Sequence, residues 1–114
     1  MIVFVGDRPS SNNASPDVPF VGTPSHKVLL QWIDNLEVKD YMLLNSHTNQ
    51  EIDMIINYYF TGAKIVALGN NASKRICGVL IPHFKLPHPS PRNRKCNDKG
   101  WLSLALAACK EYIA

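Results

Sequence analysis

Cysteine is scarce in this chain, and its spacing excludes two common ways of stabilising a small domain. The three residues, Cys77, Cys96 and Cys109, are odd in number and widely separated, whereas a disulfide framework needs pairs at regular spacings. The same spacing does not supply the paired ligands of a zinc or iron–sulfur site. Because Cys77 and Cys109 fall in apolar helical patterns, we expect both to be packing residues in a reducing compartment. The sequence therefore predicts no metal and no cofactor.

Long apolar runs and glycine-rich phosphate motifs are also missing. The apolar stretches Met1–Val5 and Trp101–Cys109 are far too short to span a bilayer, and the first has no basic leader. We therefore expect an intracellular protein that does not enter a membrane. The lack of a phosphate-loop or dinucleotide glycine pattern disfavours an ordinary nucleotide-binding domain. Without repeats or a visible linker, the 114 residues suit one domain over 1–114.

Acidic residues are nearly absent from one segment near the C-terminal end. The net charge of +3 is only mildly basic, but the segment from Lys85 to Lys99 contains five cations and the single acid Asp98. The five cations are Lys85, Arg92, Arg94, Lys95 and Lys99. A local cationic stripe favours a polyanion as partner, and a solvated basic loop is the alternative.

The same segment contains a proline-rich stretch, Leu86–Lys95, with the sequence LPHPSPRNRK. Each proline fixes its own φ and pushes the preceding residue towards extended conformations, so His88 and Ser90 stand on a stiff, non-helical loop. An imidazole beside a basic rim suits a site on a nucleic-acid backbone. An ordinary surface loop is the alternative.

Hydrophobic periodicity predicts four strands alternating with four helices. The strands are expected at 2–5, 40–45, 64–68 and 83–86, and the helices at 26–36, 50–61, 72–80 and 101–113. Ser25 is expected to cap the first helix and Pro82 to stop the third, while Trp32 and Trp101 fall on apolar faces and are expected in the core. This alternation predicts an α/β fold: a three-layer α/β/α arrangement around a four-stranded, mostly parallel sheet.

Polar and glycine-containing segments follow each expected strand. These segments are Gly6–Pro9, Asn45–His47, Gly69–Asn71 and His88–Pro91. Because ligands bind outside the carboxyl ends of strands in such sheets, we expect these segments to meet at one edge and to form the functional site.

Four segments of the chain form a recognisable set in this order: VGDRPS at Val5–Ser10, PFVG at Pro19–Gly22, MLLN at Met42–Asn45 and HPSP at His88–Pro91. Together these segments resemble the uracil-DNA glycosylase superfamily. Ile65–Ala72 is a weaker match to a glycine-containing loop that contacts phosphates. The resemblance covers nearly the whole chain. It implies a DNA glycosylase that flips out uracil, or a related modified pyrimidine, and hydrolyses its N-glycosidic bond in base-excision repair.

The resemblance also implies roles for individual residues. Phe20 would stack on the flipped base, Asn45 would pair with the pyrimidine edge, and His88, as a neutral imidazole, would donate a hydrogen bond to the developing oxyanion. Gly6 and Arg8 would line the base site. Contacts with DNA would fall on Pro9, Ser10, Gly69, Asn70, Pro89, Ser90, Pro91, Arg92 and Arg94, and Arg92 or Arg94 is the candidate to enter the vacated stack.

The residue that would orient the attacking water departs from the family pattern. The most efficient members place an aspartate just before the first proline, where this chain has Arg8, and its carboxylate, Asp7, comes one residue earlier. Asp7 is the first candidate for this catalytic role and Asp17 the second. If neither reaches the water, the protein would bind a flipped base without cleaving it.

Other functions therefore stay open beside the glycosylase. The chain also lacks the iron–sulfur cysteines of the branch that Pro19–Gly22 resembles, and it is shorter than most members. An inactive DNA-binding or replication accessory module on the same fold is one alternative, and an enzyme of modified-pyrimidine metabolism is another. In each DNA-directed case we expect a monomer that binds single- or double-stranded DNA.

Overall fold

The computed structural model describes residues 1–7, 24–89, 94 and 98–114. Along this part of the chain, strands and helices alternate as the sequence predicts. The elements are β1 (Ile2–Val5), α1 (Pro24–Asn35), β2 (Tyr41–Leu44), α2 (Asn49–Phe60), β3 (Lys64–Leu68), α3 (Asn70–Gly78), β4 (Phe84–Leu86) and α5 (Lys99–Ile113). Their ends differ from the predicted ones by at most two residues.

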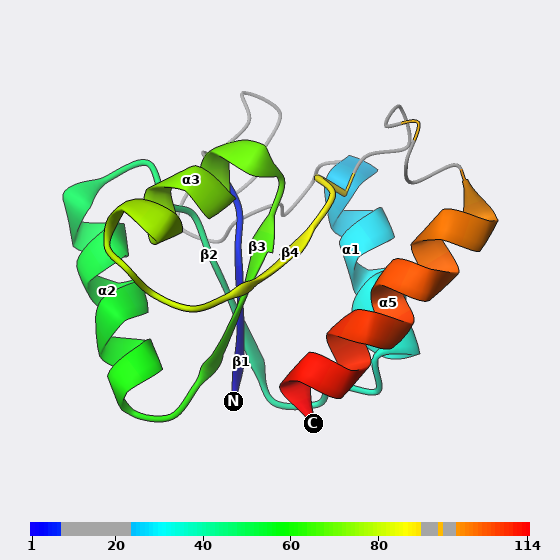
Figure 1. The fold of residues 1–114 in the computed structure, drawn as a ribbon, viewed down its shortest axis with the longest axis horizontal. Coiled ribbons are helices and arrows are strands. Elements are labelled where there is room, and N and C mark those ends of the chain that lie inside the picture. Colours follow the sequence, from blue (N-terminus) through cyan, green and yellow to red (C-terminus); the bar gives the residue numbers. More distant parts are fainter. Residues whose placement is uncertain (8–23, 90–93, 95–97) are drawn as a thin grey trace.

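The four strands form one sheet in the order β2-β1-β3-β4, and every pairing is parallel. The sheet was predicted to be mostly parallel, and within the described chain it is entirely so. In register, Val5 pairs with Leu44 and Ala67, and Leu68 pairs with Leu86. All four strands therefore end at the same edge, which is the upper edge of the sheet in Figure 1.

Helices cover both faces of the sheet, as Figure 1 shows: α1 and α5 lie on one side, and α2 and α3 on the other. Side chains alternate along β1, so Ile2 and Phe4 pack with α1 and α5, whereas Val3 and Val5 pack with α2 and α3. The two resulting cores lie on opposite faces of one sheet. The predicted three-layer α/β/α fold is confirmed.

The order in which successive strands join the sheet reverses between β1 and β3. From β1 it passes through α1 to β2 on one side, and from β2 it returns through α2 to β3 on the other side of β1. The loops that leave β1 and β3 therefore diverge to opposite faces of the sheet. In open parallel sheets, ligands bind in the crevice at such a switch point.

Two helix boundaries differ from the prediction for local reasons. α1 begins at Pro24, so Ser25 lies inside the helix and not before it; proline suits the first helical position because its missing N–H has no helical partner there. α3 ends at Gly78, before Pro82, and Leu80 adopts a left-handed φ of 61°. The chain has thus already left the helix when the proline arrives.

Two of the residues predicted to pack in the core are exposed. Trp32 is buried, but Trp101 is 40% exposed in the first turn of α5. Cys109 is buried, whereas Cys77 is exposed, because it follows the inward-facing Ile76 and is turned towards solvent. These two predictions were wrong, because helical periodicity indicates which face of a helix a residue lies on but not how deeply that face is buried at each residue.

α5 is the longest helix of the described chain, with 15 residues, of which Leu106 and Cys109 are buried and Leu104 is 74% exposed. Neither α5 nor any other described helix combines the length and apolarity that crossing a membrane requires.

Candidate functional site at the carboxyl edge of the sheet

Buried polar side chains occur at one place in the described chain, directly after β2. Asn45 is 3% exposed and Ser46 is 2% exposed. The Ser46 hydroxyl donates a 2.8 Å hydrogen bond to the carbonyl oxygen of Gly6, which follows β1. Burying a polar group is costly unless the group is paired. Two buried polar residues in succession therefore mark the edge between β1 and β2 as a candidate site.

Asp7 connects the loop after β1 to its neighbours on both sides. Its carbonyl oxygen accepts hydrogen bonds from the Ser46 backbone N–H and from Nη1 of Arg75, both at 3.1 Å. Its carboxylate forms an ion pair with Arg75 through Oδ1 and accepts a 3.2 Å hydrogen bond from Asn71 Nδ2 through Oδ2. Both carboxylate oxygens are therefore engaged by α3.

Arg75 holds this edge together, and it was not among the site residues predicted from the sequence. Besides its contacts with Asp7, its Nη1 lies 3.3 Å from the Ser46 hydroxyl. The guanidinium therefore contacts the loops after both β1 and β2 from a helix that follows β3. One signal was present in the sequence: Arg75 stands three residues after Ala72 and one before Ile76, so it flanks the buried face of α3.

Gly69 brings β3 close to β4 at the same edge. Its N–H donates a 2.8 Å hydrogen bond to the carbonyl of Leu86. Its φ is +94°, and a Cβ placed there would lie 3.3 Å from the Cβ of His88. Glycine is required at this position for two reasons: the left-handed φ disfavours a side chain, and His88 occupies the space that a Cβ would need.

His88 follows β4 and keeps access to solvent, with its ring partly desolvated by the surrounding protein. This desolvation lowers the pKa of the imidazole from the usual 6.5, and the negative charge of Asp7 acts in the opposite direction without reversing it. The ring is therefore neutral at pH 7, and a neutral imidazole carries one N–H donor and one acceptor. The influence of Asp7 on this pKa also indicates that the two predicted catalytic residues lie near each other.

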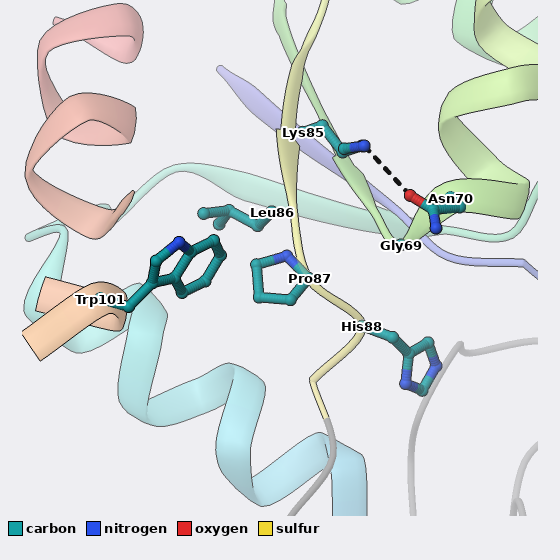
Figure 2. A pocket seen from close by; sticks show the side chains of 7 residues that line it. All are labelled: Gly69, Asn70, Lys85, Leu86, Pro87, His88 and Trp101. Carbon is teal, nitrogen blue, oxygen red and sulfur yellow. Dashed lines mark hydrogen bonds between the residues drawn. The ribbon is translucent and has the colours of Figure 1, made fainter. Parts of the chain in front are cut away.

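A pocket of about 300 Å³ lies beside His88 and runs along the end of β4 (Figure 2). Its lining residues are Gly69, Asn70, Lys85, Leu86, Pro87, His88 and Trp101. Lys85 Nζ donates a 3.0 Å hydrogen bond to Asn70 Oδ1, drawn as the dashed line in Figure 2. Trp101 was predicted to lie in the core, so its place in the lining of this pocket was not expected from the sequence.

Two further histidines, His83 and His47, make contacts within the fold. His83 forms hydrogen bonds with the Ser73 hydroxyl at 2.8 Å and the Ile81 carbonyl at 2.9 Å, so it ties α3 to the segment before β4. His47 is exposed and lies 2.8 Å from a Glu51 carboxylate oxygen. Within the described part of the chain, no cluster of histidine, cysteine or acidic side chains could hold a metal ion.

The structure describes only part of the predicted site. Six of the predicted residues lie at or directly after the carboxyl ends of the strands: Gly6, Asp7, Asn45, Gly69, Asn70 and His88. Pro89, predicted to contact DNA, is buried, and Arg94 is exposed, with its carbonyl accepting a 3.1 Å hydrogen bond from the N–H of Asp98. Eight others lie outside the described residues: Arg8, Pro9, Ser10, Asp17, Phe20, Ser90, Pro91 and Arg92.

Removing the Arg75 guanidinium should destabilise the protein. We expect Arg75→Met to lower the free energy of unfolding by about 1.5–3 kcal/mol, the usual range for hydrogen bonds to charged groups, because Asp7 would lose its main partner. Lys74→Met, at the exposed neighbouring position, should change it by less than about 0.5 kcal/mol. Urea denaturation of the three proteins at pH 7 measures both values. Equal effects of the two substitutions would contradict the role given to Arg75.

The lowered pKa of His88 predicts a pH dependence of stability. Below about pH 6.5 the unfolded chain binds a proton at this position more readily than the folded chain, so stability falls as the pH falls through this range. His88→Gln cannot be protonated and should lose less stability than the wild type between pH 7.5 and pH 5. Urea denaturation across this range tests the difference. Parallel curves for the two proteins would contradict the shift.

Comparison of the chain with protein-family models, curated proteins and solved structures finds no match. Function is therefore inferred from the residues of the site: a buried amide after β2, a clamped carboxylate after β1, and a neutral imidazole after β4.

Proposed function

We propose that this protein is a DNA glycosylase that removes uracil, or a related modified pyrimidine, from DNA. The observation that carries the proposal is the convergence of Asp7, Asn45 and His88 on one edge of a parallel sheet, beside its switch point. Each of the three has the chemistry that this reaction needs. Such a substrate would place the protein in an intracellular compartment that contains DNA.

Asn45 has the groups needed to select a pyrimidine. A side-chain amide offers a donor and an acceptor, so it can pair with a ring N–H and the adjacent carbonyl of uracil at once. The near-complete burial of Asn45 would make this selection strict, because a base that does not pair would leave buried polar groups unsatisfied. Thymine has the same edge, so its exclusion requires a steric block near the ring's 5-position.

His88 would stabilise the leaving group. When the N-glycosidic bond breaks, its electron pair passes to the base, and negative charge develops on a ring carbonyl oxygen. A neutral imidazole N–H aimed at that oxygen would stabilise the charge, and one preorganised donor of this kind contributes about 3–4 kcal/mol in other enzymes. The lowered pKa of His88 supports this role, since the neutral ring is the form present at pH 7.

Water completes the reaction by adding its oxygen to the sugar carbon, and its proton is finally transferred to the departing base. Asp7 is the described carboxylate at this edge, and its contacts with Arg75 and Asn71 fix its orientation. The same contacts occupy both carboxylate oxygens with donors, so fewer lone pairs are left to accept a proton from water. Orientation of water, with no proton transfer to Asp7, is the role that fits these contacts.

The engagement of both Asp7 oxygens also favours a second function, a DNA-binding module that holds a flipped base without cleaving it. In this case Asp7 and Arg75 serve the fold, and the site binds DNA with a steep dependence on salt. Base release separates the two functions, since only the glycosylase leaves an abasic site.

We expect release of free base from a uracil-containing oligonucleotide. His88→Ala should slow release by about 10²- to 10³-fold, as for one lost oxyanion donor, and Asn45→Ala by about tenfold or more, because each 1.4 kcal/mol of lost hydrogen bonding is a factor of ten. The exposed His47 provides the matched control, and His47→Ala should retain most activity. Chromatography of the released base measures all four proteins.

A pair of glycine substitutions tests whether the position of His88 matters. Gly62 and Gly69 both have a left-handed φ, but only a side chain at Gly69 would press on His88. Gly69→Ala should therefore slow base release much more than Gly62→Ala, which introduces the same kind of backbone strain without the contact to His88. Absence of release from single- and double-stranded DNA by the wild type, with uracil and with modified pyrimidines, would exclude the glycosylase and leave the binding module.

A further inference from the structure

The pocket along β4 has features that the proposed chemistry does not use. It passes over the edge strand of the sheet, from Trp101 at the start of α5 on one face to Asn70 at the start of α3 on the other. Figure 2 shows the indole beside Leu86 and Pro87, with the Lys85 side chain and Asn70 on the other side of β4 and the His88 imidazole directed away from the indole. The pocket therefore adjoins the proposed catalytic residue but extends beyond it.

Trp101 gives this pocket an accessible aromatic face. Its side chain is 40% exposed, whereas that of Trp32, the other tryptophan, is 3% exposed. The start of the helix fixes the backbone that carries the indole, because the backbone N–H of Trp101 donates a 3.1 Å hydrogen bond to the capping carboxylate of Asp98. An exposed aromatic ring on a fixed backbone is a platform on which an unpaired nucleobase can stack.

Lys85 supplies a cation at the other end of the pocket. It is exposed and is held by Asn70 at the first residue of α3, so its ammonium lies near the N-terminal end of a helix, where anions are favoured. A phosphate could take two partners here, the ammonium and the Asn70 side-chain amide. An aromatic face and a phosphate-binding cation in one pocket of about 300 Å³ match the two parts of a nucleotide.

A protein partner suits this edge less well. β4 is only three residues long and carries an exposed lysine at its centre, and both features disfavour pairing with a strand of another chain. The indole and the ammonium are also separated along the edge strand, which suits a polymer that crosses the edge. A nucleic-acid strand presents bases and phosphates in this alternating way.

We propose that this pocket binds an unpaired nucleotide of a single DNA strand, with the base stacked on Trp101 and a phosphate on Lys85. The proposal rests on the proposed function only in taking DNA as the polymer. It makes single-stranded DNA the preferred substrate, because the bases of an intact duplex are stacked on each other and offer no free face to the indole. The nucleotide in the pocket is a neighbour of the base that reaches Asn45 and His88.

The test is binding of a fluorescently labelled oligothymidine without uracil, compared with the same sequence as a duplex, at several salt concentrations. Wild type should bind the single strand more tightly and show quenching of tryptophan fluorescence, which we assign to Trp101 because Trp32 is buried and cannot stack on a base. Trp101→Ala should weaken single-strand binding by about 5- to 150-fold. Trp101→Phe should retain most affinity while losing the quenching, and it serves the test if the alanine variant does not fold.

Matched controls come from other exposed positions. Leu104→Ala removes an exposed apolar side chain of α5 and should leave binding unchanged. Lys85→Met should reduce the slope of log affinity against log salt by about 0.7, the value for one phosphate of a single strand. Lys110→Met, which removes an exposed cation that pairs with Glu37, should change neither affinity nor slope.

Several outcomes would overturn the proposal. They are equal affinity for single strand and duplex, unchanged binding by Trp101→Ala, and identical effects of Lys85→Met and Lys110→Met. Because the probe contains no uracil, its binding is independent of base release. If the wild type releases no base but Trp101→Ala loses single-strand binding, only the proposed glycosylase activity is overturned. If the wild type releases base but Trp101→Ala binds the single strand unchanged, only the proposed nucleotide pocket is overturned.

Discussion

The guanidinium of Arg75 connects three segments that are distant in sequence, and the shape of the carboxyl edge depends on this connection. It forms an ion pair with the Asp7 carboxylate, donates to the Asp7 carbonyl and lies 3.3 Å from the Ser46 hydroxyl. Parallel strands place their ends at one edge, but their loops need further contacts to take one arrangement. At this edge, a cation from α3 provides those contacts for the loops after β1 and β2.

In the proposed site, Asp7 and His88 would have different roles in the reaction. The Asp7 carboxylate is ion-paired with Arg75 and accepts a hydrogen bond from Asn71, so its orientation is fixed, and this suits orienting a water molecule. His88 is kept neutral by partial desolvation and can donate to the charge that develops on the base. A glycosylase built in this way would depend more on stabilising the leaving base than on activating the nucleophile, and its activity would be modest.

Much of the fold could be predicted from the sequence because its signals are local. Four short apolar strands alternate with amphipathic helices. A glycine, asparagine or histidine stands within two residues of the end of each strand. The rule that parallel strands share a carboxyl edge then brings Asp7, Asn45 and His88 to one side. Gly69 could be placed there as well, although its close approach to His88 appears only in three dimensions.

Two kinds of feature could not be predicted from the sequence. They are contacts between residues that are distant in the sequence, and the degree to which a side chain is buried. Arg75 and Asp7 are 68 positions apart, and nothing local distinguishes this arginine from a solvated one. Trp101 has the helical spacing of a core residue, but it stands in the first turn of α5 and is 40% exposed. The roles given to Arg8 and Phe20 stay predictions, since both lie outside the described residues.

The central claim is that this edge of the sheet binds a pyrimidine between the loops after β2 and β4. A crystal structure of the protein with free uracil and an oligonucleotide containing an abasic site tests it most directly. We predict uracil paired with the Asn45 amide, with a ring oxygen within hydrogen-bond distance of the His88 imidazole. Uracil bound elsewhere, or ordered DNA that leaves the Asn45 and His88 side chains without contact to the base, would contradict the account.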